Sequence, residues 1–329
     1  MTAQESFVHS LNFRLEALPH RSLPWRLLRQ DPESASLSSR GFVGGSDQSR
    51  QVLGEGAANF IRGFNYVIDS ASVGELHDRL DDVPPGQRGF AYEGAGMACA
   101  ILDILTYSHG RRVAALLEGP GDNYIHLIHV GTGWGFARLR LRPWRGVRFK
   151  DSMLRWLAWD GWGFHQGFFS PRRTVVAQRT EARLGTAMSI RDQGIGRSIW
   201  FHDCADVVVI AERINRFDQR RRPDLWSGVG LAAAYAGGVH GADLARLGEL
   251  AGGMRAHVAQ GVAFAAAARL RSGDIPPHTR RAAEILAGIP AEVAADWTDA
   301  ALAGLTGENV SSYETWRARI RQRWHECHD

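Results

Sequence analysis

The sequence has almost no lysine, few cysteines and no long apolar run. Of its 39 basic residues only Lys150 is a lysine, which leaves 38 arginines. The three cysteines lie far apart, which excludes a disulfide scaffold, a zinc ribbon or a CxxC redox motif and fits a reducing compartment. No apolar stretch reaches about 18 residues, and the first residues do not form a signal peptide. We therefore expect a cytoplasmic protein without a membrane-spanning helix.

Familiar catalytic and cofactor motifs are also missing. There is no GxSxG, no Walker loop and no HExxH, and the paired glycines lack the strand and third glycine of a dinucleotide fingerprint. The Asp81-Asp82 pair is followed by Val83-Pro84-Pro85, so the aspartate-rich motif of ionisation-type terpene synthases is not met. The segment 325–328 (His-Glu-Cys-His) is interpreted as an unstructured end rather than a metal site. The sequence predicts no cofactor and no metal.

The composition is that of a folded chain. Hydrophobic residues make up 44% and charged residues 22% of 329 residues, with a net charge of +4, so a substantial buried core is expected. The abundance of arginine, alanine and glycine indicates a GC-rich genome. The densest basic run, 138–150, is interpreted as a solvated edge, with contact to an anion as the alternative. No nucleic-acid partner is predicted.

An internal repeat organises the chain. Residues 69–100 align without a gap on residues 203–234, and nine of the 32 positions are identical. Shorter matches flank this block, 54–56 with 194–196 and 129–137 with 257–265. The identities include Arg88/Arg222, Gly94/Gly228 and Gly96/Gly230. The repeat predicts two copies of one module, related by a pseudo-twofold axis.

Each copy is predicted to be helical. Val73, Leu76 and Leu80 recur at three to four residues, as do their counterparts in the second copy, and strand-like alternation is scarce. The paired glycines would let two helices approach closely. The predicted fold is all-α and compact, in one domain. Its parts are an N-terminal arm (1–50), a first module (51–138), an insert (139–193), a second module (194–271) and C-terminal helices (272–329).

Glu93 is the first candidate catalytic residue. It lies in an apolar, glycine-rich helix, where a carboxylate is costly unless it is paired, and its counterpart in the second copy is Ser227. Burial there would raise its pKa and suit it to general acid–base catalysis. The alternative is a buried carboxylate that serves structure only.

The insert holds an acid and a histidine among aromatic residues. Asp160 and His165 are five residues apart, which places them on different faces of a regular helix, and Gly161 and Gly163 make a turn plausible. Such a pair could move a proton on a hydrophobic substrate while aromatic rings shield a developing cation. The alternative is an aromatic-packed core. Asp192 and Gln193 either cap a helix or point into a cavity.

The remaining candidates are assigned to substrate binding. They share an aromatic ring or a polar group within the motifs described above. They are Tyr92, Trp134, Trp162, Phe164, Asp192, Gln193, Arg197, Trp200, Trp226 and Tyr235.

Four segments together resemble one bacterial family of unknown function, associated with enediyne-type biosynthesis genes in actinobacteria. The segments are 88–95, 160–165, 192–201 and 224–232. Trp162 stands where the family usually has tyrosine, so no hydroxyl is available there as a proton donor. The resemblance implies specialised metabolism and genomic proximity to electron-transfer-like membrane proteins, but it supplies no reaction.

Two hypotheses follow. In the first, the protein is an enzyme that cyclises or isomerises a hydrophobic polyene, polyketide or isoprenoid, with Glu93, Asp160 and His165 moving protons in one common cavity. In the second, it is a non-catalytic binding or scaffold protein of an enediyne-type assembly. The second hypothesis allows peripheral contact with membrane-bound pathway proteins.

Overall fold

The computed structural model describes residues 26–42, 44–144, 147–149, 151–180, 185 and 187–328. Within this part of the chain there are fourteen α-helices and no strand, which confirms the all-α prediction. The α-helices are α3 (Asp47–Asp69), α4 (Val73–Asp81), α5 (Pro85–Leu105), α6 (Arg111–Leu116), α7 (Ile125–Arg138), α8 (Leu157–Phe169), α9 (Ala187–His202), α10 (Val207–Asn215), α11 (Arg222–Ala236), α12 (Gly241–Ala251), α13 (Arg255–Arg271), α14 (Pro277–Ala282), α15 (Ala291–Leu302) and α16 (Val310–His328). Short 3₁₀ and π turns join them, namely η1 (Pro32–Ala35), η2 (Gly119–Tyr124), η3 (Leu154–Trp156), η4 (Arg172–Val176), η6 (Gly252–Met254) and η7 (Ala283–Ala287).

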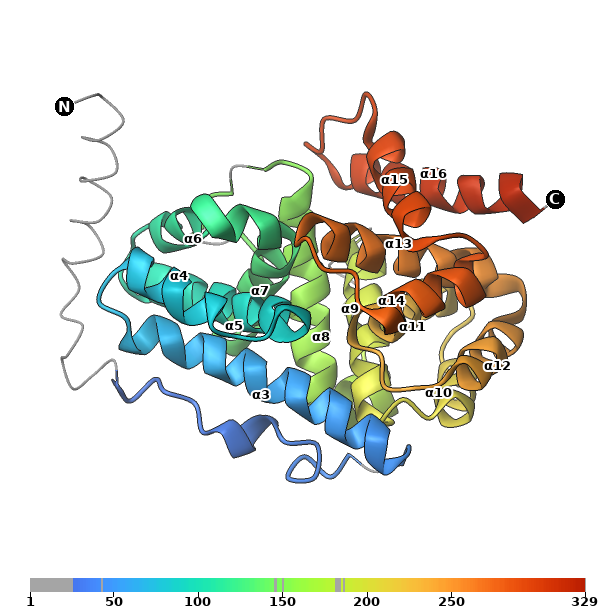
Figure 1. Cartoon of the computed structure of the whole chain (residues 1–329), viewed down its shortest axis with the longest axis horizontal. Coiled ribbons are helices and arrows are strands. Elements are labelled where there is room, and N and C mark those ends of the chain that lie inside the picture. The colour runs from blue at the N-terminus through green and yellow to red at the C-terminus, as the bar shows by residue number, and fades with distance from the viewer. Residues whose placement is uncertain are drawn as a thin grey trace.

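Seven helices pack side by side in one row. Their order is α3, α5, α7, α8, α9, α11 and α13, and each packs on the next. Figure 1 shows α8 and α9 at the centre, α4–α7 on one side and α10–α14 on the other. The short helices α4, α6, α10 and α12 lie outside the row, and α15 and α16 pack against α13. The interior is therefore built from neighbouring helix faces.

Glycines allow neighbours in the row to touch through their backbones. A Cβ built on Gly194 of α9 would lie 1.9 Å from the carbonyl oxygen of Asp160 on α8, and one on Gly163 of α8 would lie 2.1 Å from that of Arg191 on α9. No side chain fits at such a distance. Every neighbouring pair in the row has a reciprocal glycine pair of this kind: Gly63/Gly94, Gly96/Gly131, Gly133/Gly161, Gly163/Gly194, Gly196/Gly228 and Gly230/Gly261. The predicted role of the paired glycines in close helix approach is confirmed.

Positions paired by the repeat have matching contacts. Arg88 donates to the carbonyl oxygens of Val83 and Asp81, and Arg222 donates to those of Phe217 and Asn215, which lie 134 residues further on. The order of the elements from α3 to α7 also returns from α9 to α13. An ancestral duplication and its twofold axis stay predictions.

The two flanking matches of the repeat are wrong in register. Gly63 abuts the backbone of Ala91 as Gly196 abuts that of Leu225, whereas Gly56, to which the sequence matched Gly196, meets only the Phe90 ring. Gly131 packs on the carbonyl of Glu93 as Gly261 packs on that of Ser227, so Gly131 corresponds to Gly261 and not to residue 259. The physical reason is that the spacing of helix crossings, rather than residue identity, fixes the equivalence.

Several local predictions are corrected. Gly161 and Gly163 form no turn but lie inside α8, and Asp192 and Gln193 lie inside α9 rather than at its start. The predicted domain boundary after residue 193 therefore cuts α9, and α8 is a member of the row rather than an insert. The tail 325–328 is helical because α16 continues to His328.

The described part of the N-terminal arm lies as a strap over the row. Ala35, Leu37 and Phe42 are buried, and the Phe42 ring packs edge-on against Phe168, with 5.2 Å between ring centroids. Residues 1–25 of the predicted arm lie outside the described residues. None of the described helices combines the length and apolarity needed to cross a membrane.

Candidate functional site

Buried polar side chains follow the line of glycine crossings. Six successive helices of the row carry the pattern X-Gly-x-Gly, or X-Gly-x-Ala in α13, and the position X is polar in five of them. The residues at X are Glu93, Val130, Asp160, Gln193, Ser227 and Gln260. Because X precedes the glycine at each crossing, these side chains occupy the same level in neighbouring helices.

Glu93 and Asp160 share one arginine. Arg197 of α9 donates through Nη1 to Oδ1 of Asp160, and its Nη2 lies 3.6 Å from Oε1 of Glu93. The indole N–H of Trp134 donates to the same Glu93 oxygen at 3.0 Å. The three charged side chains are almost fully buried. Two carboxyl groups thus face one guanidinium, which can neutralise only one of them.

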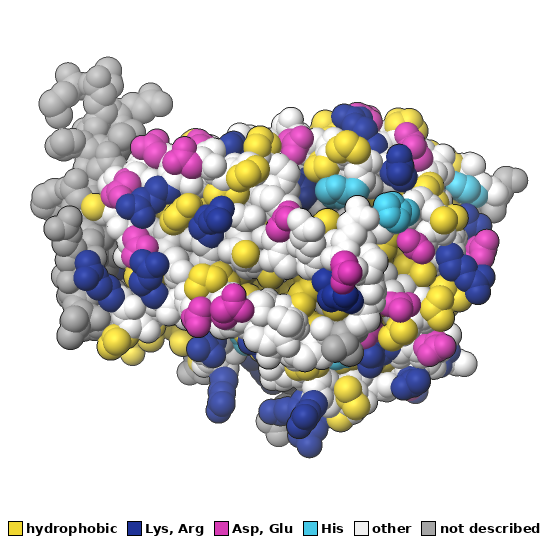
Figure 2. All heavy atoms as spheres, turned by 60° about the horizontal axis from the view of Figure 1, so that its bottom comes forward, with side chains coloured by type: hydrophobic (Ala, Val, Ile, Leu, Met, Phe, Trp, Pro, Cys, Tyr) yellow, Lys and Arg dark blue, Asp and Glu magenta, His cyan; other side chains and the backbone are white. Residues whose placement is uncertain are grey.

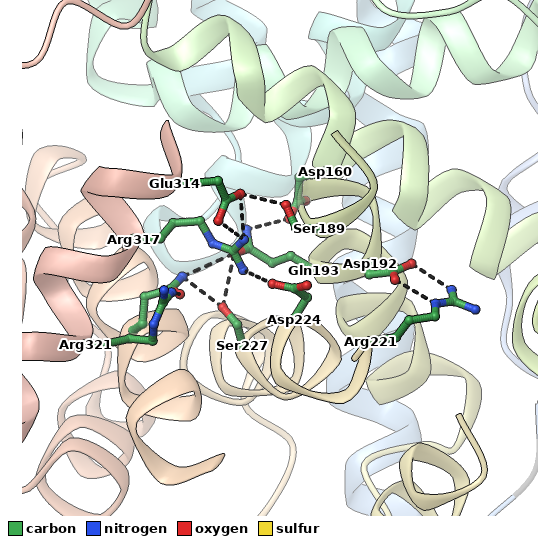
Figure 3. A network of polar contacts seen from close by, with 11 residues as sticks. Asp160, Ser189, Asp192, Gln193, Arg221, Asp224, Ser227, Glu314, Arg317 and Arg321 are labelled. Atoms are coloured by element: carbon green, nitrogen blue, oxygen red, sulfur yellow. Dashed lines mark hydrogen bonds and ion pairs between the residues drawn. The ribbon is translucent and has the colours of Figure 1, made fainter. Parts of the chain in front are cut away.

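The polar chain continues from Asp160 toward α16 (Figure 3). Gln193 donates to Oδ2 of Asp160 at 2.8 Å, and its own oxygen accepts from Ser227 at 3.1 Å. Gln260 donates to Ser227 Oγ at 2.9 Å and accepts from Arg321 at 2.9 Å. A continuous set of hydrogen bonds therefore leads from the shared arginine to the C-terminal helix.

Glu93 faces an apolar hollow, which we call the aromatic hollow. Its walls come from α3, α5, α7, α8, α9 and the strap, and Glu93 and Arg197 are the charged side chains among the described residues that line it. Seven aromatic rings line it: Phe60, Phe90, Trp134, Phe164, Phe168, Phe169 and Phe201. The hollow has about 40 Å³ of free room, enough for a few water molecules.

Burial changes the protonation of Glu93. The pKa of Glu93 is raised to about 7, chiefly because burial removes the solvation of the carboxylate; the charge of Arg197 and the hydrogen bonds from Trp134 and Arg197 oppose this rise, and the negative charge of Asp160 adds to it. The carboxyl group therefore exchanges a proton near neutral pH, as a general acid–base group must.

Asp160 faces a second hollow, lined also by Val130, Tyr235, Phe264 and Trp316. It has about 50 Å³ of free room. Arg197 lines both hollows, so the shared guanidinium lies between them.

The prediction that Glu93, Asp160 and His165 line one common cavity is wrong. His165 lines a third, basic pocket together with Trp162, whose indole N–H donates to the carbonyl of Leu141 at 2.9 Å. The predicted turn at Gly161 and Gly163 does not form, and α8 continues through both glycines. Because side chains five residues apart on a helix point in different directions, Asp160 and His165 face different pockets.

Five other predicted substrate-binding residues line none of the hollows described here, and one of them, Gln193, belongs to the polar chain instead. Tyr92 stacks on Tyr124 at 4.1 Å between ring centroids. The indole of Trp200 donates to Gly237 O, and Trp226 is packed in the core. Asp192 is bound by Arg221 through two hydrogen bonds of 2.7 Å, apart from the polar chain that runs through Gln193 (Figure 3). Each of these side chains has a structural role.

Sequence reasoning missed part of the aromatic wall and of the polar chain. Phe60, Phe90 and Phe201 line the hollow, and Ser227 and Gln260 carry the hydrogen bonds. The spacing contained a signal, because Phe90 precedes Glu93 by three residues and so shares its helix face. The recurrence of X-Gly-x-Gly in successive helices would have identified Ser227 and Gln260.

The site's chemistry is that of proton transfer beside apolar walls. Within the described residues there is no group of three or more His, Cys, Asp or Glu side chains that could hold a metal ion. A carboxyl group titrating near neutrality, positioned by an arginine and an indole, can protonate or deprotonate an apolar ligand.

Comparisons with known proteins give the family but no activity. No curated protein and no solved structure matches the chain. The family described as "Protein of unknown function (DUF1702)" matches residues 20–324, nearly the whole length. The chain therefore belongs to the DUF1702 family.

Proposed function

We propose that this protein is a biosynthetic enzyme of specialised metabolism that cyclises or isomerises a hydrophobic polyene, polyketide or isoprenoid without a cofactor. The observation that carries the proposal is Glu93, a carboxyl group with a pKa of about 7 that faces seven aromatic rings. The resemblance of four sequence segments to an enediyne-associated family supports the metabolic setting. A cytoplasmic location belongs to the same proposal.

Glu93 acts as the acid and then as the base. Its protonated carboxyl group gives a proton to a carbon–carbon double bond, whose π electrons form the new C–H bond and leave a carbocation. In a cyclisation, the π electrons of a second double bond attack that cation and close a ring. In an isomerisation, no ring forms and the carbon skeleton keeps its connectivity. The Glu93 carboxylate then removes a proton from a neighbouring carbon, which restores the acid and leaves a new double bond.

The surroundings support each stage. Arg197 and Trp134 hold the carboxylate form, so the base is present when the cation collapses. An aromatic face stabilises a cation by about 2 kcal/mol when solvent is excluded. Asp160 is a positioning residue, because it binds Arg197 from the side away from the aromatic hollow.

A bulky substrate requires movement of the wall. The hollow's room of about 40 Å³ is less than a polyene occupies. Phe168 and Phe169 near the end of α8, together with Ala35 of the strap, form part of this wall and are the groups that a substrate would displace.

The test combines gene deletion with metabolite profiling of the source strain. Deletion should cause an intermediate to accumulate, and wild-type protein should restore the product. Glu93→Gln should not restore it, although its far-UV circular dichroism and melting temperature show a folded protein. The matched control is Asp122→Asn, which changes an exposed acid paired with Arg271 and should restore the product.

The purified protein provides the direct assay. Incubated in D₂O with the accumulated intermediate, wild type should deliver one solvent deuterium into the product, and Glu93→Gln none. Restoration by Glu93→Gln with unchanged deuterium uptake would overturn the acid–base assignment. Loss of product only on deletion of residues 1–30 would favour the binding or scaffold alternative.

A further inference from the structure

A basic pocket of about 680 Å³ lies where α7 and α8 end. Arginines line it from four places in the chain: the strap, the end of α7, the segment that follows α7, and η4. They are Arg40, Arg138, Arg140, Arg142 and Arg173. We propose that this arginine pocket binds the phosphate groups of a phosphorylated organic ligand. The inference concerns binding and does not depend on catalysis by Glu93.

The charges that the described residues bring to the pocket are of one sign. None of the described residues that line it is acidic, and Arg138, Arg140, Arg142 and Arg173 form no ion pair with any described residue. Elsewhere the signs are mixed, and the face in Figure 2 carries acidic and basic side chains interspersed over most of its area. Because like charges repel, five arginines in one pocket favour a bound polyanion.

The arginines are held by a fixed frame. The Trp162 indole binds the carbonyl of Leu141, and the amide of Leu141 binds the carbonyl of Phe136, so the segment that carries Arg140 and Arg142 is anchored at its middle. The guanidinium of Arg40 lies 4.0 Å from the centroid of the Phe169 ring, and its Nε donates to Ser34 O at 3.0 Å. A frame ordered in advance lowers the entropy cost of binding.

His165 adds an imidazole ring to the wall of the pocket. Its Nε2 is buried and makes no hydrogen bond with a described residue, while its ring packs against Phe169 with 4.6 Å between centroids. Burial, assisted by Arg138 and Arg40, lowers the pKa of His165 to about 3, so the imidazole is neutral. A neutral imidazole leaves the positive charge of the pocket to the arginines.

The size and the charge together select the ligand class. Phosphate groups accept paired N–H bonds from guanidinium forks and carry up to two charges each, whereas a carboxylate carries one. The pocket is larger than an inorganic phosphate needs, and Trp162 and Phe169 give it apolar surface. A phosphate or diphosphate ester fits both features. It could be a free metabolite or a lipid head group, which have the same phosphate chemistry.

The test measures binding of inorganic pyrophosphate to the full-length protein by calorimetry at low salt, with acetate as the comparison. Pyrophosphate should bind at least about tenfold more tightly than acetate. Arg138→Gln/Arg173→Gln should weaken pyrophosphate binding by about tenfold or more. Neither side chain makes a hydrogen bond with any of the described residues, so the variant should keep the wild-type melting temperature.

A matched variant controls for net charge. Arg220→Gln/Arg246→Gln removes the same two charges at exposed sites outside the pocket and should change binding less than about twofold. Glu93→Gln should bind pyrophosphate as wild type does, even if the proposed catalysis fails. Equal weakening by the two arginine pairs, or pyrophosphate binding no tighter than acetate binding, would overturn the proposal.

Vesicles distinguish the two sources of phosphate. Sedimentation with phosphatidic acid vesicles, displaced by pyrophosphate and lost in Arg138→Gln/Arg173→Gln, would assign a lipid head group. Pyrophosphate binding without vesicle binding would assign a free phosphate ester. Failure of both probes to bind would contradict the site itself.

Discussion

Glu93 and Ser227 occupy corresponding positions before a glycine pair, yet they place different demands on their surroundings. Ser227 is satisfied by the neutral amides of Gln193 and Gln260. Glu93 needs a cation or a proton, because a buried carboxylate without either is strongly destabilising. The carboxyl group at this position, where the second copy has a serine, is therefore compensated by the nearby charge of Arg197 and by a raised pKa.

Stability should depend on pH through Glu93. Its folded-state pKa of about 7 exceeds the ordinary value of 4.5, so the folded state holds the proton more tightly than the unfolded state. The stabilisation is complete below about pH 4.5 and is lost as the pH rises toward 7. The free energy of unfolding should then fall by at most about 3 kcal/mol. Urea unfolding at pH 5 and pH 8 measures it, with Glu93→Gln as the reference that cannot titrate.

As the pH rises, the free energy of unfolding of wild type should therefore fall relative to that of Glu93→Gln. A carboxyl C=O stretch near neutral pH, present in wild type and absent in Glu93→Gln, gives an independent infrared readout. A pH-independent difference would show that Glu93 does not titrate in this range.

Removal of Arg197 should be among the most damaging single changes. Arg197→Met leaves two buried carboxyl groups without a cation, and we expect a loss of about 3–5 kcal/mol in the free energy of unfolding. In the triple variant with Glu93→Gln and Asp160→Asn most of that loss should be absent, because no buried charge is left. Chemical denaturation of the single and triple variants checks this. Equal loss in both would mean that Arg197 acts through packing alone.

At the scale of the helix, glycine pairs decide how closely the row can pack. Gly194 of α9 and Gly54 of α3 both lie inside helices, but only Gly194 abuts a neighbouring backbone. In an exposed helix interior, replacement of glycine by alanine stabilises by up to about 1 kcal/mol. At a crossing, the added methyl group must separate two helices.

Gly194→Ala should therefore destabilise by about 1–3 kcal/mol or more, whereas Gly54→Ala should be neutral or stabilising by up to about 1 kcal/mol. The two variants carry the same chemical change, so their difference isolates the crossing. Thermal or urea unfolding measures both. Similar effects at the two sites would contradict backbone contact between α8 and α9.

The helices themselves followed from the sequence more reliably than their ends and turns. Helices were predicted for the two modules and for residues 272–329, and α3 to α7, α9 to α13 and α14 to α16 lie wholly or mostly there. Helix α8 was missed because two glycines within three residues usually favour a turn. In the row the same glycines are stabilised by the tight crossings that they permit.

At the scale of the whole molecule, the protection of backbone amides against hydrogen exchange should decrease from the centre of the row to its borders. Helices α7, α8 and α9 each pack between two neighbours, and their middles are buried almost throughout. The strap and the short outer helices have neighbours on one side only. Amide hydrogen exchange should be slowest in α7–α9 and fastest in residues 26–46, because local opening there exposes least apolar surface. Uniform exchange across the chain would contradict this order.

Residue types and their spacing determined the all-α fold, the close helix approach at the paired glycines and the choice of Glu93 as a carboxyl group under strain. These features are local, because helix periodicity, glycine content and the cost of a buried charge depend on neighbouring positions in sequence. Only the tertiary structure decided which side chains meet. It joined Glu93 to Arg197 and Asp160 across four helices, and it moved His165 to a separate basic pocket. The rotation of each helix about its axis, set by the reciprocal glycine contacts with both neighbours, fixes those partners.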